Sequence, residues 1–291
     1  MVRISNGQAG PHLAVFAAMH GTEYASVAAL GHLIQTLDAR RVRGTLSLVP
    51  VANRLAFESR TMYVCPPDGK NLNRTFPGDP HGSYAEVLAD LLWREVASQA
   101  SHVLDIHGGE LVEGLVPFTG AYVLHAQPEV ARASRQLAEA FATPYLVMNE
   151  VPAVAEGGSR LCHVATRAGI PAALAEAGQL GRMDEPDVRF IAEGVRNVMR
   201  TLGMLDEPVA PPPRERIVLE EIEVYAHSTG LFHARVAPGD AIEPGQHLGE
   251  IVDYLGNTVE RFESQWSGVV LGVIGPAMVE GRFPLVIGVR G

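Results

Sequence analysis

Apolar residues in this chain form short continuous runs that alternate with longer segments of helical periodicity. The runs, each bounded by turn residues, lie at 12–19, 45–52, 102–106, 121–125, 144–148 and 171–178. A run without polar alternation is typical of a strand that is covered on both faces, as in a parallel sheet. We therefore expect these six runs to form strands inside one sheet.

Four segments between the runs have helical spacing: 22–38, 84–99, 128–141 and 186–203. Ser83 and Glu86 have the spacing of a capping box at the start of the second. That helix would carry its apolar side chains on one face: Val87, Leu88, Leu91, Leu92 and Val96. The alternation of strands and helices predicts an α/β domain with a mixed, largely parallel sheet and helices on both faces.

The composition changes near residue 212. The segment 205–216, "LDEPVAPPPRER", is rich in proline and charge and is typical of a stiff linker. Beyond it, short apolar runs are separated by "PGD", "PGQ", "LGN" and "IGP", the rhythm of a small all-β unit. We therefore expect an α/β domain over residues 1–211 and a small barrel-like β domain over residues 212–291.

Charge and cysteine content limit which partners and which cellular location are expected for the protein. The formal net charge of −10 provides no basic stripe to neutralise phosphates, so a nucleic-acid partner is not expected. No apolar run approaches the ~20 residues that cross a bilayer, so no membrane partner is expected either. The two cysteines, Cys65 and Cys162, imply no disulfide framework, and a reducing cytoplasm is the expected location.

Two motifs place possible metal ligands at the ends of predicted strands. In "HGTE", His20 closes the first strand and Glu23 lies in the first turn of the next helix; in "VLDIHGG", His107 closes the third strand. Carboxyl ends of parallel strands meet at one edge of a sheet, and zinc takes about four His, carboxylate or Cys ligands. Asp105 could form a hydrogen bond to the His107 ring and so fix its orientation. The alternative, that Glu23 only favours a helix N-terminus, remains open here.

Three motifs in order, "HGTE", "NLNRTFPG" (71–78) and "DIHGG" (105–109), resemble the succinylglutamate desuccinylase/aspartoacylase family of the zinc-carboxypeptidase superfamily. The resemblance covers roughly residues 10–180. It implies a zinc-carboxypeptidase-like fold and one zinc ion per chain, held by His20, Glu23 and His107.

The same resemblance implies roles for four further side chains. Asn73 and Arg74 would bind a substrate carboxylate, for which arginine offers two parallel N–H donors. Arg60 would polarise the scissile carbonyl and stabilise its oxyanion. Glu176, at the end of the last predicted strand, would be the general base, because a carboxylate desolvated beside a metal has a pKa raised towards neutrality.

Several other residues depart from the family pattern or have no role in it. Arg54 and Asn71 stand where relatives usually have proline and aspartate, which leaves the substrate's identity open. Glu110 and Glu113 follow His107 closely and are expected in a solvated loop. Arg160 could reach a substrate, but no sequence feature favours this.

The small C-terminal unit resembles a biotinyl/lipoyl barrel in the rhythm "PGQHLGEI … WSGVV". Residues 217–291 contain no lysine, so nothing there could carry biotin or lipoate, and a carrier role is excluded. Two roles remain open for this unit, which are packing beside the active site and contact between subunits.

The sequence therefore predicts a zinc-dependent hydrolase that cleaves the amide bond of an N-acylated amino acid or a similar small carboxylate-bearing amide. The expected partner is this small-molecule substrate, and assembly into a homo-oligomer is left open. One alternative is a zinc carboxypeptidase acting on peptides, and a second is a catalytically silent zinc-binding protein.

Overall fold

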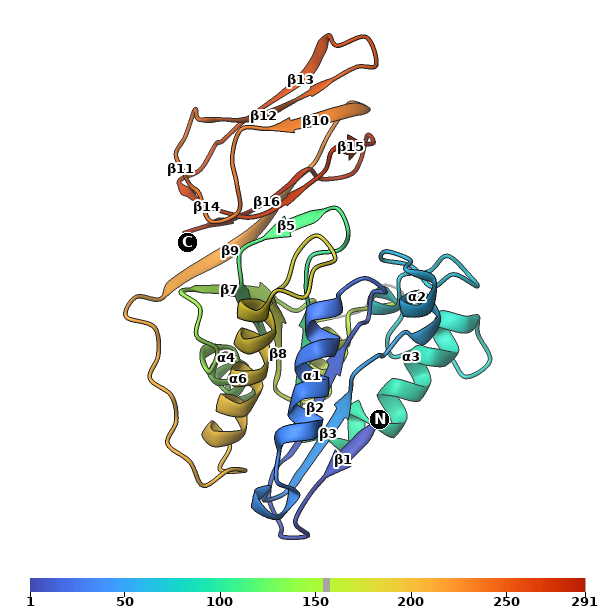
Figure 1. Ribbon diagram of the computed structural model, residues 1–291, viewed down its shortest axis with the longest axis vertical. Helices are drawn as coiled ribbons and strands as arrows, with labels where there is room; N and C mark the ends of the chain where they lie inside the picture. Colours follow the sequence, from blue (N-terminus) through green and yellow to red (C-terminus); the bar gives the residue numbers. More distant parts are fainter. Residues whose placement is uncertain (154–157, 291) are drawn as a thin grey trace.

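The computed structural model describes residues 1–153 and 158–290. A mixed sheet of twelve strands within these residues runs through the whole molecule (Figure 1). Its spatial order is β1 (Val2–Ile4), β3 (Thr45–Val49), β2 (His12–Ala17), β4 (His102–His107), β8 (Ala172–Glu176), β6 (Phe118–Val123), β7 (Tyr145–Glu150), β9 (Ile217–Val224), β16 (Leu285–Val289), β14 (Gly268–Ile274) and β11 (Ala241–Ile242), with β5 (Glu113–Leu115) paired to β14. Strands β3, β2, β4 and β8 are parallel to one another, as are β6, β7 and β9.

Helices cover both faces of the α/β part, as the sequence predicts. The helices are α1 (Tyr24–Thr36), α2 (Arg54–Ser59), α3 (Tyr84–Glu95), α4 (Pro128–Glu139), α5 (Leu161–Arg167) and α6 (Glu185–Thr201), with 3-10 turns η1 (Ala39–Arg41), η2 (Leu72–Arg74) and η3 (Ala97–Gln99). One apolar core lies between the sheet and α1, α4 and α6. A second lies between the other face and α3 and α5.

The face predicted for the second helix is wrong in part. Val87 is 41% and Leu91 48% exposed, whereas Ala85, Ala89 and Leu92 are buried. The buried residues have helical spacing too, and the small alanine side chains let the helix approach the sheet closely. The capping box is confirmed, because the Glu86 Oε2 accepts the Ser83 N–H at 2.8 Å.

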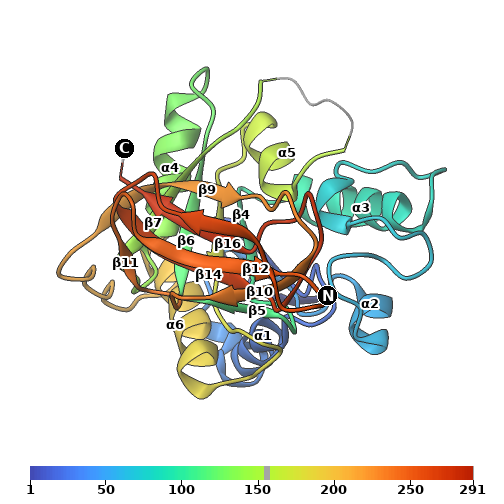
Figure 2. The ribbon, with the colours of Figure 1, turned by 90° about the horizontal axis from the view of Figure 1, so that it is seen from above.

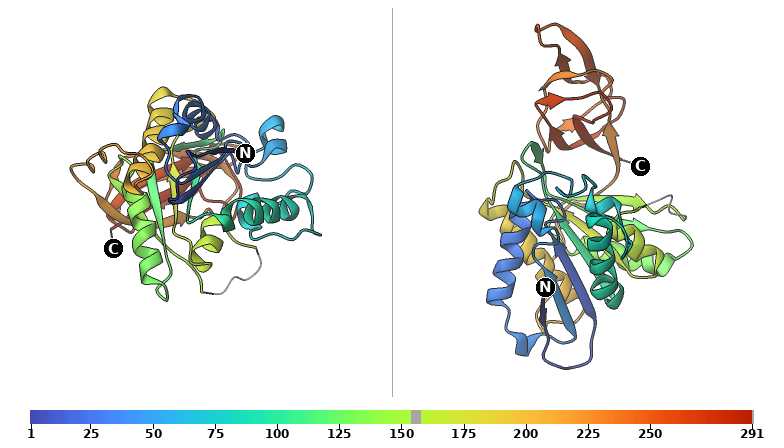
Figure 3. Two further views of the ribbon diagram at one scale, coloured as in Figure 1. Left: turned by 90° about the horizontal axis from the view of Figure 1, so that it is seen from below. Right: turned by 90° about the vertical axis from the view of Figure 1, so that its right-hand side faces the viewer.

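The C-terminal unit stands as a separate lobe above the α/β part (Figure 3, right). Its second sheet has the order β13 (Thr258–Glu263), β12 (His247–Val252), β10 (Gly230–Ala234) and β15 (Ala277–Met278), with neighbouring strands antiparallel. This sheet packs against β16 and β14 around a third apolar core that includes Phe232 and Ile251. Seen from above, the lobe lies over the sheet of the α/β part (Figure 2).

Strand β9 belongs to both parts of the molecule. It is parallel to β7, through pairs such as Val147 with Leu219, and antiparallel to β16, through pairs such as Glu221 with Gly288. The lobe also takes a strand from the α/β part, since Leu115 of β5 pairs with Gly272 of β14. The two units are therefore joined by continuous sheet as well as by the linker.

Cys65 and Cys162 are both free and buried. Among the residues that the structure describes, no helix has the length and apolar character needed to cross a bilayer.

Candidate metal centre and active site

The first motif forms a sharp connection between β2 and α1. Strand β2 ends at Ala17, and Ala18 takes a left-handed conformation with φ 49° before His20. A side chain at Gly21 would lie 2.3 Å from the Ala56 carbonyl oxygen, so only glycine lets α2 approach this turn. Glu23 then occupies the N-cap of α1. The turn therefore directs both polar side chains to the carboxyl edge of the sheet.

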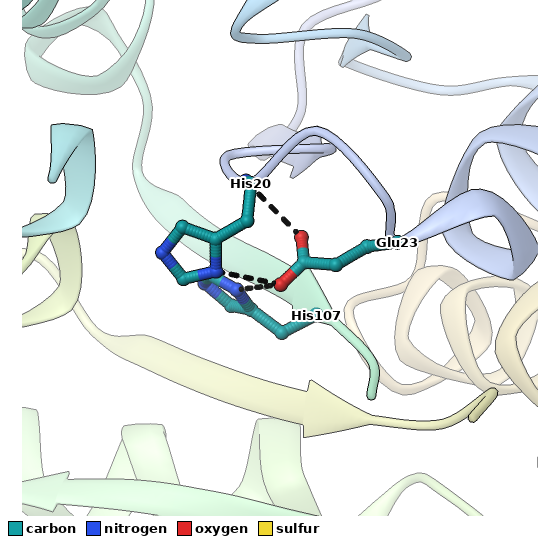
Figure 4. A group of neighbouring side chains, drawn as sticks. All are labelled: His20, Glu23 and His107. Carbon is teal, nitrogen blue, oxygen red and sulfur yellow. Dashed lines mark hydrogen bonds and ion pairs between the residues drawn. The ribbon is translucent and has the colours of Figure 1, made fainter. Parts of the chain in front are cut away.

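His20, Glu23 and His107 meet at this edge, although 84 positions separate Glu23 from His107 (Figure 4). The Glu23 Oε1 lies 2.8 Å from the Nδ1 atoms of both imidazoles. One ligand atom from each of the three residues lies within 4.8 Å of the others. Glu23 and His107 are buried, and His20 is partly exposed. Of the three side chains, His20 is therefore the one that reaches solvent.

The three side chains shift one another's pKa values. Burial disfavours the charged imidazoles, but nearby carboxylates outweigh this effect. Glu23 raises the pKa of His20, and Asp105 followed by Glu23 raises the pKa of His107 well above its ordinary value. Burial also opposes ionisation of Glu23, yet the two imidazoles lower the pKa of this carboxyl to about 2. A cation bound here would compete with protons for the same lone pairs.

The donor set fits zinc. Two imidazole nitrogens and one carboxylate oxygen are ligands that zinc prefers, and three protein ligands leave a fourth position for a substrate or water in a catalytic site. The Asp105 carboxylate supports the set, because its Oδ2 lies 3.1 Å from the His107 Nε2. A carboxylate behind a ligating histidine fixes the ring's orientation and tautomer.

Glu176 is the neighbour of His107 across the sheet, at the end of β8. Burial raises the pKa of this carboxyl well above its ordinary value, and the charges of Glu23, Glu113 and Glu221 raise it further against the opposing charge of His107. A carboxyl with a raised pKa can both accept and return a proton near neutral pH.

Backbone contacts join the two segments that carry Arg74 and Arg160. The strand-like bridge between Phe76 and Ser159 joins the loop after Arg74 to the residue before Arg160. Burial lowers the pKa of Arg74, and the charge of Arg160 lowers it further. The sequence offered no reason to choose Arg160, because the bridge joins segments more than eighty residues apart.

Strand β9 presents two carboxylates to the same region. Leu219 is buried in the core that includes Leu161 and Cys162, and strand alternation places Glu221 and Glu223 on the same face as Leu219. Among the described residues, neither glutamate forms an ion pair with Arg74 or Arg160 within 4 Å. The Tyr225 hydroxyl donates a hydrogen bond to Glu223.

Arg60 lies apart from the buried groups. It ends α2 in a left-handed conformation with φ 55°, and its side chain is exposed. Its backbone lies near the cluster, because the adjoining Thr61 carbonyl accepts the Gly21 N–H at 3.2 Å. The described contacts assign its guanidinium no partner.

The expectation of a solvated loop after His107 is wrong for Glu110. Its side chain is 1% exposed, its Oε1 accepts the Tyr63 N–H at 2.8 Å, and its Oε2 accepts the Thr22 hydroxyl. Burial first, and then the charge of Glu23, raise the pKa of Glu110 to about 8. Glu113 is half-buried in β5, where its Oε1 accepts the Tyr63 hydroxyl at 2.6 Å. The turn chemistry of "HGGE" gave no sign of these distant partners.

The fold and the cluster define an α/β protein with a candidate metal centre at its strand ends. Comparison with known families identifies it further: the succinylglutamate desuccinylase/aspartoacylase catalytic domain matches residues 9–202, and the chain belongs to this family.

Relatives agree with this assignment along almost the whole chain. The N-alpha-acetyl-L-2,4-diaminobutyric acid deacetylase of Halomonas elongata is 30% identical over 277 residues, covering 93% of this chain and 79% of the relative. A succinylglutamate desuccinylase from Silicibacter and the product-bound ectoine utilization protein EutE (DoeB) of Ruegeria pomeroyi each have a TM-score of 0.87 at 27% identity, covering 99% of this chain and 88% of theirs. The chain is thus related to deacylases of N-acylated amino acids.

Proposed function

We propose that this protein is a zinc-dependent hydrolase that cleaves the amide bond of an N-acylated amino acid. The observation that carries the proposal is the convergence of His20, Glu23 and His107 on one point, with Glu176 on the adjacent strand. The three side chains would hold the ion, and Asp105 would orient His107.

The chemistry divides between the ion and the protein. A bound zinc ion would polarise the scissile carbonyl and lower the pKa of water at the site. Glu176 would accept a proton from the attacking water as the new C–O bond forms. It would then donate that proton to the leaving nitrogen as the C–N bond breaks, giving a carboxylic acid and a free amine. Arg60 is the candidate for stabilising the oxyanion.

We assign the substrate carboxylate to the arginines. Arg74 is exposed beside the buried Asn73, whose amide nitrogen lies 2.9 Å from the His107 Nε2, and Arg160 is partly buried. A guanidinium here can hold a carboxylate through two parallel N–H bonds. Anchoring this carboxylate would fix the position of the scissile amide relative to Glu176. Such orientation of the reacting groups increases the rate.

The carboxylates of β9 favour a substrate that also carries a positive charge. Glu221 and Glu223 share the region of the two arginines without closing ion pairs to them, so opposite charges remain available to a ligand that carries both. The Halomonas relative is a deacetylase of N-alpha-acetyl-L-2,4-diaminobutyric acid, whose free amine is a cation at neutral pH. We therefore propose an N-acyl diamino acid as the substrate class.

One matched pair of substrates tests both parts of the proposal. Nα-Acetyl-2,4-diaminobutyrate and Nα-acetylnorvaline have the same shape and differ in an ammonium against a methyl group. With zinc-loaded protein we expect kcat/KM to be about tenfold to a hundredfold higher for the charged substrate, because a hydrogen bond to a charged group contributes about 1.5–3 kcal/mol. Glu223→Gln should shrink this ratio, and Glu220→Gln, on the exposed face of β9, should not.

The outcomes separate the alternatives. Activity that survives removal of zinc by a chelator would exclude the metal mechanism. Equal rates on the two substrates would exclude recognition of the substrate's ammonium group. They would not contradict the proposed deacylase activity. Cleavage of short peptides in preference to both would favour a carboxypeptidase, and metal binding without turnover of any amide would favour a silent zinc-binding protein.

A further inference from the structure

Tyr63, between α2 and η2, packs against the metal cluster on the side of His20. The two rings lie edge to face, with their centroids 6.0 Å apart and their planes at 66°. Aromatic rings at this separation attract each other and prefer this geometry. His20 is partly exposed, whereas Glu23 and His107 are buried. Tyr63 therefore restricts the ring of the most exposed candidate ligand.

The backbone of Tyr63 is strained. Its φ is 59°, and the Val64 N–H donates to the Met62 carbonyl oxygen at 2.6 Å, which makes a γ-turn centred on Tyr63. A bulky residue rarely takes a positive φ, because its side chain then crowds the backbone. Such a conformation persists only where surrounding contacts hold it. Contacts of Tyr63 with other segments must therefore maintain the turn.

Two carboxylates hold Tyr63 at opposite ends. The Glu110 Oε1 accepts the Tyr63 N–H at 2.8 Å, and its Oε2 accepts the hydroxyl of Thr22. Thr22 belongs to the same turn as His20. The Glu113 Oε1 accepts the Tyr63 hydroxyl at 2.6 Å, and its Oε2 accepts the Glu110 N–H at 3.0 Å. The two glutamates thus fix both the backbone and the side chain of Tyr63.

Glu113 also connects this arrangement to the C-terminal lobe. It begins β5, where it pairs with Ile274 of β14. The adjoining Val112 carbonyl oxygen accepts the Gly275 N–H at 3.1 Å. The strand that holds the Tyr63 hydroxyl is therefore itself held by the lobe.

We propose that Tyr63 is a positioning residue, which holds the His20 ring in place for the metal ion, and that Glu113 holds Tyr63 against that ring. Through β5 the C-terminal lobe supports the metal centre, although none of the three clustered ligands comes from it. This inference rests on the proposed zinc-dependent function.

Zinc affinity measures this role without substrate or turnover. We expect Tyr63→Leu to raise the zinc dissociation constant about two- to tenfold, the size of an edge-to-face aromatic contact, because nothing then restricts His20 on this side. Tyr63→Phe keeps the ring and loses only the hydroxyl, so it should raise the constant by a smaller factor. Competition with a chromophoric chelator measures each value, and circular dichroism shows whether each variant is folded.

Glu113→Ala tests whether this carboxylate acts through the tyrosine. The effect of Tyr63→Phe should disappear in the Glu113→Ala protein, because the hydroxyl then has no acceptor to lose. Comparing Tyr63→Phe in the two backgrounds cancels any effect of the lost Glu113 charge itself.

Tyr24→Leu is the matched control. Tyr24 directly follows Glu23, and its ring lies edge to face on Phe57 with centroids 5.7 Å apart. The substitution removes a comparable contact beside another candidate ligand, but one that does not involve His20. It should lower thermal stability and leave zinc affinity unchanged.

Unchanged zinc affinity in Tyr63→Leu would overturn the inference. An equal loss of affinity in Tyr24→Leu would overturn it too, because affinity would then follow general destabilisation. A Tyr63→Phe effect that is absent from the start, or that persists in the Glu113→Ala protein, would reject the role of Glu113. These paired measurements also decide the question should Tyr63→Leu not fold. Failure of the wild-type protein to bind zinc would instead reject the proposed function, so the two failures are distinguishable.

Discussion

At the scale of single residues, the site depends on carboxylates whose pKa values are moved in opposite directions by their surroundings. Glu23 contacts two imidazoles and its pKa is lowered, whereas burial raises the pKa of Glu176 at the next strand end. Under the proposed function, the same side-chain type would thus provide an ionised ligand and a proton acceptor. Sequence order alone does not distinguish them, because neighbours from other strands set each environment.

Glu176→Gln should lower kcat about 10²- to 10⁴-fold, the usual contribution of general acid–base catalysis, and leave zinc affinity nearly unchanged. The shape is kept, but the proton acceptor is lost. Steady-state kinetics and chelator competition measure the two quantities. Because the base must be ionised, wild-type activity should rise with pH through a pKa above the ordinary glutamate value. The residual activity of the variant should not show this rise. Wild-type activity in Glu176→Gln would reject the assignment.

At the scale of elements, the start of α3 shows how local chemistry fixes a boundary. Ser83 and Glu86 form the capping box, and the Lys70 Nζ lies 2.8 Å from the same Glu86 Oε2. The hydrogen bond with Lys70, followed by those with Ser83, lowers the pKa of Glu86 to about 2. The folded state therefore favours the ionised carboxyl.

Glu86→Gln should reduce the free energy of unfolding at pH 6 and have progressively less effect as pH falls. A lowered pKa contributes stability above the unfolded value near 4.5, and this contribution is lost between there and about 2. Urea unfolding at pH 6 and pH 3 measures the difference. Glu58→Gln, at an exposed ion pair with Arg54 on α2, is the control with little expected effect. A penalty that does not change with pH would contradict this account.

At the scale of the whole molecule, the two units share buried surface. Leu271 of β14 is fully buried in the core beneath α3 and α5, and its carbonyl oxygen accepts the Val116 N–H from the α/β part at 3.0 Å. Leu219 of β9 belongs to the same core. The lobe thus completes the packing of the α/β part beside the candidate active site.

We expect calorimetry to show one unfolding transition for both units, because they share sheet and core. Leu271→Ala should destabilise the whole transition by about 2–5 kcal/mol through lost burial and a cavity. Leu231→Ala, at a position 43% exposed in β10, should change it by less than about 0.5 kcal/mol. Two separate transitions, with only the weaker one moved by Leu271→Ala, would show that the units fold independently.

The sequence alone determined the elements that depend on local pattern. Continuous apolar runs predicted β2, β3, β4, β6, β7 and β8 near their observed bounds, and spacing predicted α1, α3, α4 and α6. It also identified His20, Glu23 and His107 as candidates, because strand ends and tight glycine turns are readable locally. It missed the short β1 and β5, whose pairing comes from distant strands.

Tertiary structure alone decided the relations between segments far apart in the chain. Only the folded chain brings Arg160 beside the loop of Arg74, buries Glu110, and passes the main sheet through β9 into the C-terminal lobe. These features depend on which strands pair and on which side chains lose water together. A local pattern of polar and apolar positions records neither, since both arise from packing across the sheet.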